Sequence, residues 1–186
     1  MMKNRLISLV GYQGVWLAAV IGAGHGLWWP GPLALLPFAI WQIAGNAQPR
    51  AELRLMLAIG VMGCLLDSAF AAYGVLAFAA AVPSPALAPI WIVAIWMAFA
   101  LTLTSTFRFL DGHPWLAALL GTVGAPLTYL AAAHGWNAVT FPRGETLAMS
   151  ALAAGWALAL PVALWLATWA YRADRLRPAL RTRAAP

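Results

Sequence analysis

An aspartate inside a long apolar stretch is the residue of this sequence best placed to do chemistry. Asp67 lies in "GCLLDSAF", within the apolar segment Leu53–Leu76. Insertion of an aspartate at the centre of a membrane helix costs about 2.5–3.5 kcal/mol, so such residues are often functional. Asp67 would act as an acid or base in catalysis, or it would form a structural hydrogen bond that holds two helices together. The sequence leaves both interpretations open.

Other polar and aromatic side chains are expected at a similar depth. A helix rises about 1.5 Å per residue, which places Asp67 about 20 Å from the inner end of its helix and Thr128 and Tyr129 near the same level. If the protein is an enzyme, the candidates are Asp67 as acid or base, assisted by Tyr129 and His134. For ligand binding, the candidates are His25, Asp67, Ser68, Trp91, Thr128, Tyr129 and His134. A quinone or isoprenoid would stack on Trp91 or Trp96, and the favoured alternative is an interface anchor for Trp91 and a packing role for Trp96.

Metal and cofactor chemistry has little support in the sequence. Two histidines, His25 and His134, come without a set of carboxylates or cysteines, and the lone Cys64 is expected to be a packing residue. The motifs G-x-S-x-G and H-E-x-x-H, the P-loop and C-x-x-C pairs do not occur. We therefore expect neither a metal nor a cofactor, and the question of enzymatic activity stays open.

The composition indicates that these residues are carried on membrane helices. Hydrophobic residues make up 63% of the 186 residues, charged residues make up 9%, and the mean hydropathy is +0.80. A soluble domain contains about 25% charged residues. The 11 tryptophans fit a membrane protein, because tryptophan gathers where hydrocarbon meets lipid headgroups.

Six apolar segments predict an all-α polytopic protein with six transmembrane helices. A helix needs about 20 apolar residues to cross a bilayer. The segments are Leu6–Gly24, Gly31–Ala44, Leu53–Leu76, Leu87–Phe107, Pro114–Ala133 and Thr146–Tyr171. The prolines in "WWPGP" favour a tight turn and a helical hairpin of the first two segments. We expect one transmembrane domain over residues 1–171 and a short basic cytoplasmic tail over residues 172–186.

The distribution of basic residues predicts the orientation. With six crossings and both termini in the cytoplasm, ten of the 11 Lys and Arg residues fall on the inner side, and Arg143 alone falls outside. Lys3 and Arg5 before an apolar run resemble a signal peptide, but we expect an uncleaved first helix. The net charge of +6 reflects topology and contact of the tail with anionic lipid, and we expect no nucleic acid as a partner.

Stripes of small residues predict which helix faces pack together. Small residues let membrane helices approach closely. Gly60, Gly63 and Ala71 share a stripe with Asp67, and Gly121, Ala125 and Tyr129 form another. Asp67 and Tyr129 should therefore face the interior of the bundle, with the larger apolar side chains turned to lipid.

Three stretches together resemble a known family. "GCLLDSAFAAYGVLAF", "APIWIVAIWMAFALTLTSTFRFL" and "GTVGAPLTYLAAAHG" resemble an uncharacterised family of small proteobacterial inner-membrane proteins, the domain of unknown function 2878. The family has a glycine-glycine-proline run before its tyrosine, where this chain has Gly124-Ala125-Pro126. The resemblance implies an architecture and a compartment but no established activity. Some relatives occur beside genes for modifying membrane fatty acids, which favours lipid chemistry.

Two hypotheses on function follow from the sequence. In the first, the protein binds or moves a small lipid-like ligand, or supports a membrane-lipid enzyme. In the second, it is itself an enzyme acting on lipid or isoprenoid chains, with Asp67 as acid or base. Membrane lipids are the expected partners, and a membrane-protein partner or a homo-oligomer remains open.

Overall fold

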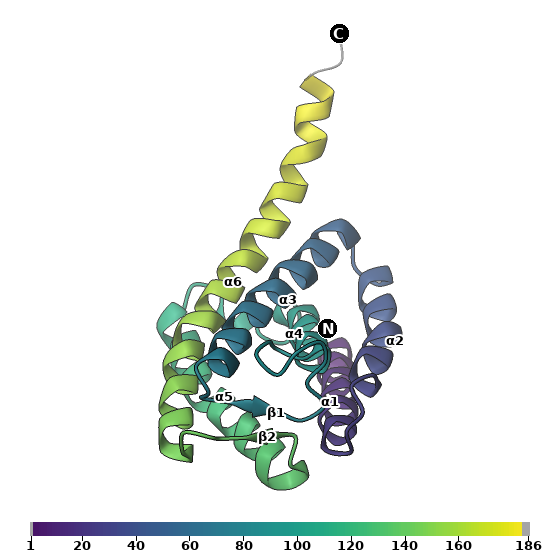
Figure 1. Cartoon of the computed structure of the whole chain (residues 1–186). Helices are drawn as coiled ribbons and strands as arrows, with labels where there is room; N and C mark the ends of the chain where they lie inside the picture. The colour runs from purple at the N-terminus through teal and green to yellow at the C-terminus, as the bar shows by residue number, and fades with distance from the viewer. Residues whose placement is uncertain (1, 184–186) are drawn as a thin grey trace.

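Six α-helices make up most of the computed structural model, which describes residues 2–183, with side chains over residues 6–172 (Figure 1). The helices are α1 (Met2–Gly24), α2 (Pro30–Ala44), α3 (Pro49–Ala72), α4 (Ile90–Leu103), α5 (Pro114–Trp136) and α6 (Glu145–Arg183). A 3-10 turn, η1 (Arg108–Leu110), and two short strands, β1 (Ala77–Phe78) and β2 (Val139–Thr140), lie between them. The all-α fold with six helices is confirmed.

Four of the helices are long and apolar enough to cross a membrane. These segments are Leu6–Gly24, Pro49–Ala72, Pro114–Trp136 and Glu145–Arg172. Helices α2 and α4 have 15 and 14 residues, so they are about 22 and 21 Å long and shorter than the hydrocarbon core of about 30 Å. The prediction of six crossings and of cytoplasmic termini therefore stays a prediction.

Proline and glycine determine where the first two helices end and meet. Helix α1 ends at Gly24, Gly26 adopts a φ of +79°, and α2 starts at Pro30, where the missing N–H of proline has no cost in the first turn. The two helices then pack closely, because a Cβ at Gly31 would lie 2.6 Å from the Cβ of Ala19. This contact confirms the predicted packing of the first two helices as a hairpin.

Helix α4 forms the centre of the protein. Ten of its 14 residues are buried, and it contacts α1, α2 and α3. A helix that is apolar on all sides is expected in such an interior position. Trp91 is fully buried, with its ring against Phe78 and its Nε1 donating to the carbonyl of Ala79 at 2.9 Å. The alternative role of Trp91 as an interface anchor is therefore wrong.

A small strand pair replaces part of the expected outer loops. Strands β1 and β2 are antiparallel, with Ala77 opposite Thr140 and Phe78 opposite Val139 (Figure 1). Phe78 and Val139 are 8% and 2% exposed, so burial of apolar side chains holds this pair against the bundle. Sequence analysis did not predict the strands, because two-residue strands give no periodic pattern.

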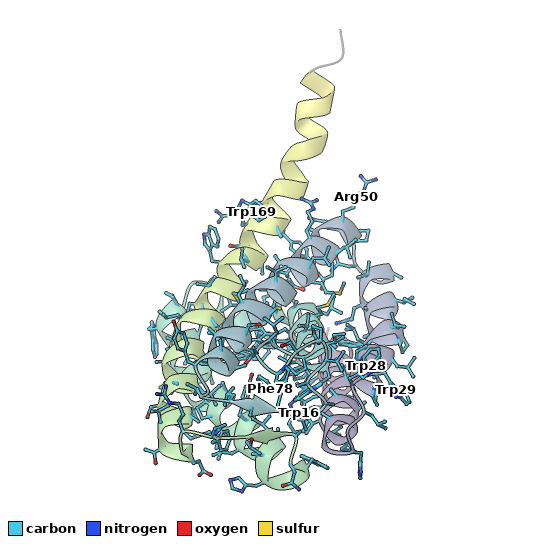
Figure 2. The ribbon with its side chains drawn as sticks, viewed as in Figure 1. Trp16, Trp28, Trp29, Arg50, Phe78 and Trp169 are labelled. Atoms are coloured by element: carbon cyan, nitrogen blue, oxygen red, sulfur yellow. The ribbon has the colours of Figure 1, made fainter. Side chains whose placement is uncertain are left out.

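The tryptophans divide between the surface and the interior. Trp28, Trp29 and Trp169 are 41%, 46% and 53% exposed, whereas Trp16 is 8% exposed (Figure 2). Exposed tryptophans near helix ends are typical of membrane proteins. Helix α6 extends past the expected end at Tyr171 to Arg183 and projects away from the other helices (Figure 1). The division into residues 1–171 and 172–186 stays a prediction.

Candidate functional site

Asp67 is fully buried and accepts two short hydrogen bonds. Its Oδ2 accepts from Nε1 of Trp96 at 2.6 Å, and its Oδ1 accepts from the hydroxyl of Tyr129 at 2.5 Å. An indole N–H can only donate, so the carboxyl oxygen facing Trp96 is an acceptor. These two bonds join α3 to α4 and α5, and they give a buried carboxyl group the partners that it needs.

A glycine on α3 makes this arrangement sterically accessible. Gly63 lies one helical turn before Asp67, and a Cβ there would fall closer than 3.0 Å to the Cγ, Cδ1 and Cδ2 atoms of Trp96. The indole therefore lies directly across the Gly63 backbone on its way to Asp67. The expected inward stripes are confirmed at these positions, since Gly63, Asp67 and Tyr129 are all buried.

Trp96 also belongs to a cluster of rings. It stacks on Trp156 of α6, with ring centroids 4.3 Å apart and an angle of 15° between the planes. Phe99 meets both indoles edge-on, at 6.2 and 5.8 Å. Such offset and edge-on contacts are favourable beyond the burial of area. The hydrogen bond to Asp67 thus fixes one member of a rigid aromatic wall.

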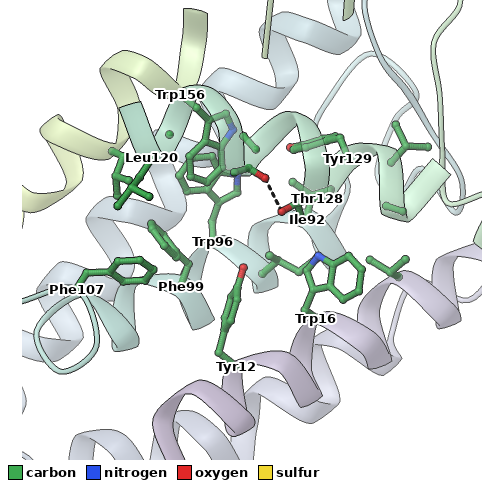
Figure 3. A pocket seen from close by; sticks show the side chains of 18 of the residues that line it. Tyr12, Trp16, Ile92, Trp96, Phe99, Phe107, Leu120, Thr128, Tyr129 and Trp156 are labelled. Carbon is green, nitrogen blue, oxygen red and sulfur yellow. Dashed lines mark hydrogen bonds between the residues drawn. The ribbon is translucent and has the colours of Figure 1, made fainter. Parts of the chain in front are cut away.

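This wall borders a cavity of about 290 Å³ between α1, α4, α5 and α6 (Figure 3). Among the 20 described residues that line it, none is charged. Its aromatic residues are Tyr12, Trp16, Trp91, Trp96, Phe99, Phe107, Tyr129 and Trp156. Small-molecule sites in proteins are typically mostly apolar, with a few polar groups that orient the ligand.

The cavity reaches the outer surface between α1 and α5. Two of its lining residues, Leu9 and Leu120, are 41% and 38% exposed, and Gly124 is exposed as well. Helices α1 and α5 each contain a segment that is long and apolar enough to cross a membrane, and the opening lies between them.

Asp67 itself does not line the cavity, although both of its donors do. Asp67 accepts hydrogen bonds from Trp96 and Tyr129 on the side away from the cavity and so fixes the orientation of both side chains. It would therefore act on a bound molecule only through these two residues. Thr128 also lines the cavity, with its hydroxyl donating to the carbonyl of Gly124 at 2.8 Å. Ser68 lies elsewhere, where its Oγ accepts from the backbone N–H of Ala88 at 2.9 Å and anchors the segment before α4.

The structure does not bring His25 and His134 to this site. His25 is exposed beyond the end of α1, and His134 pairs with Glu145 at 2.9 Å with 68% of its side chain exposed. Both residues belong to the ends of helices, where a depth count along one helix says little about neighbours. Within the described part of the chain, no three His, Cys, Asp or Glu side chains form a group that would hold a metal ion.

Several residues of the cavity and a second buried acid were not predicted from the sequence. Tyr12, Trp16 and Trp156 line the cavity, and so does Trp96, for which packing was the favoured expectation. The four-residue spacing of Tyr12 and Trp16, which puts them on one helix face, was the available signal.

The second buried acid is Glu52, in the first turn of α3, which is 2% exposed. Its Oε2 accepts from Nδ2 of Asn46 at 3.0 Å and from the hydroxyl of Tyr171, so the cluster joins α3 to α6. The isolated position of Glu52 before an apolar run was the signal for its burial.

Four long apolar helices, three of which line an uncharged aromatic cavity, indicate a membrane protein. The model of the family described as "protein of unknown function (DUF2878)" matches residues 5–162. The chain therefore belongs to that family, which confirms the resemblance noted in its sequence. No curated protein and no solved structure matches the chain.

Proposed function

We propose that this protein is an integral membrane protein that binds a small lipid-like molecule in the cavity between α1, α4, α5 and α6. The observation that carries the proposal is the combination of eight aromatic lining residues with an apolar opening beside Leu9 and Leu120. A neutral apolar molecule is already in apolar surroundings in a bilayer. Its transfer into the cavity is favourable only if the cavity walls pack closely against it, and rigid aromatic walls provide such a fit. The bacterial inner membrane is the proposed location.

The second hypothesis, an enzyme that uses Asp67 as acid or base, has weaker geometric support. Both oxygens of Asp67 are occupied, and the carboxyl group does not line the cavity. A general acid or base must lie within hydrogen-bonding reach of the proton that it transfers. Asp67 is better placed to position Trp96 and Tyr129, and His134 is too exposed to assist it.

Photolabelling tests the binding proposal. A photoreactive alkyl-diazirine hydrocarbon would be added to the purified chain in lipid nanodiscs, and labelled peptides would be mapped. We expect labelling of Leu9, Phe107 and Leu120 that an excess of unlabelled hydrocarbon competes away. Labelling spread evenly over the exposed leucines, with no competition at these three residues, would refute a specific site.

A matched pair of variants sharpens this experiment. A Cβ at Gly124 or at Gly135 would have no atom within 4 Å, and both glycines are exposed on α5, but only Gly124 lines the cavity. Gly124→Phe should abolish the competed labelling by filling the opening, and Gly135→Phe should leave it unchanged. Equal labelling of the two variants would contradict the proposal.

A further inference from the structure

Two polar groups on α1 face the cavity and have no hydrogen-bond partner among the described residues. Tyr12 and Trp16 are four residues apart and therefore lie on the same helix face. Figure 3 shows the hydroxyl of Tyr12 and the indole of Trp16 directed into the cavity from α1. Neither the hydroxyl nor the Nε1 atom makes a hydrogen bond to any residue that the structure describes, although Trp16 is only 8% exposed. Both atoms are accessible, unlike the Nε1 of Trp156, so a molecule in the cavity would supply the acceptor that they lack.

The remaining polar groups of the cavity wall are already engaged. Trp96 and Tyr129 donate to Asp67, Trp91 donates to the carbonyl of Ala79, and Thr128 donates to the carbonyl of Gly124. Trp156 is the exception, because its Nε1 is buried without a partner. The cavity thus offers unused donors from Tyr12 and Trp16, whereas the Nε1 of Trp156 is inaccessible to a ligand.

The chemistry of these groups restricts the ligand. An indole N–H can only donate, so its partner must be an acceptor such as a carbonyl oxygen. A charged headgroup is disfavoured, because the lining residues supply no countercharge and burying an unpaired charge is costly. Carboxylates and phosphates therefore do not fit, whereas a neutral carbonyl compound does.

The shape and walls of the cavity restrict the ligand further. The stacked Trp96–Trp156 pair and the edge-on Phe99 present flat surfaces, on which a planar ring packs well. The volume of about 290 Å³ is at the lower end of the range for small-molecule pockets, about 300–1,000 Å³. A ring would fill it, and an attached apolar chain would leave through the opening beside Leu9 and Leu120.

We propose that the ligand is a neutral quinone-type molecule, whose ring lies against the aromatic wall and whose carbonyl oxygen accepts from Tyr12 and Trp16. This inference rests on the proposed function, since it names the class of molecule bound in the same cavity. Tyr12 and Trp16 determine specificity for a carbonyl group, and the aromatic wall supplies affinity for the ring.

A comparison of ligands tests the inference on the purified full-length chain in nanodiscs. The probes are a decyl-substituted benzoquinone, decylbenzene and decanoate, and affinities are obtained from the rise in Tm with ligand concentration. We expect the quinone to bind at least fivefold more tightly than decylbenzene, because its carbonyl oxygen accepts from Tyr12 and Trp16 and each of these hydrogen bonds accounts for about fivefold. Decanoate should bind more weakly than both.

Variants show whether the extra affinity comes from α1. Tyr12→Phe should weaken quinone binding by about fivefold and leave decylbenzene binding unchanged. Tyr73→Phe is the matched control, because Tyr73 is 73% exposed and does not line the cavity. Trp16→Phe should act like Tyr12→Phe on the quinone.

The outcomes separate the two proposals. If decylbenzene binds as tightly as the quinone, or Tyr12→Phe weakens both equally, the quinone assignment is wrong while cavity binding stands. Tight binding of decanoate would overturn the requirement for a neutral ligand. If neither apolar probe raises Tm, the proposed function fails and the assignment fails with it.

Discussion

Adding one methyl group at Gly63 should break the contact between Trp96 and Asp67. In the Gly63→Ala variant the new Cβ would overlap three atoms of the Trp96 indole. The indole has little room to retreat, because it stacks on Trp156 at a centroid distance of 4.3 Å. The indole must therefore shift against tightly packed neighbours, and its hydrogen bond to Asp67 is lost.

The magnitude follows from three contributions. Overpacking a tight core costs about 1–3 kcal/mol, and loss of a hydrogen bond to a charged group costs about 1.5–3 kcal/mol. Replacing glycine by alanine inside a helix returns about 1 kcal/mol. We therefore expect Gly63→Ala to lower the free energy of unfolding by about 1.5–5 kcal/mol.

Thermal unfolding in detergent micelles measures this change, and circular dichroism of the stacked indoles reports on Trp96 directly. Gly14→Ala is the control, because Gly14 lies within α1 and a Cβ there would have no atom within 4 Å. The control should keep the indole signal, and its Tm should stay the same or rise, because alanine favours the helix by about 1 kcal/mol over glycine. If Gly63→Ala matches Gly14→Ala in both measurements, the close packing of Trp96 across Gly63 is refuted.

Three further changes test other parts of the structure. Asp67→Ala should lower the unfolding free energy by about 2–6 kcal/mol, because it leaves two buried donors unpaired. Asp67→Asn should lower it by less, because the side-chain amide can still form hydrogen bonds. Denaturation of the two variants side by side checks this order. Tyr171→Phe should cost about 1.5–3 kcal/mol by removing a donor to the buried Glu52, measured as a loss in Tm, and an unchanged Tm would contradict that contact. His25→Ala should leave both Tm and quinone affinity unchanged, since His25 is exposed and outside the cavity lining; a tenfold loss of affinity would place it in the site.

Much of the fold follows from local pattern. Apolar segments and the prolines at Pro30, Pro49 and Pro114 locate the starts of the helices to within a few residues, and small-residue stripes turn Asp67 and Tyr129 inward. Helix α4 was expected to extend over Leu87–Phe107, but regular helix covers only Ile90–Leu103. The apolar composition of this segment reflects burial among other helices as much as contact with lipid, and hydropathy does not separate the two.

The site could be predicted only in part, because it depends on contacts between helices. The estimated heights along the two helices predicted that Asp67 and Tyr129 lie at the same level. These heights do not predict which face of a third helix contacts the two residues. Trp96 is found only once α4 lies across Gly63, and Tyr12 and Trp16 only once α1 lies opposite α5. His25 and His134 were expected near Asp67 by depth, yet both point away at helix ends.

Native mass spectrometry of the protein purified from its own membrane tests cavity binding most directly. The wild type and Gly135→Phe should each retain one small apolar molecule per chain, and Gly124→Phe, with its opening filled, should retain none. An empty wild-type chain, or the same bound molecule at the same occupancy in Gly124→Phe, would contradict a lipid-facing binding cavity.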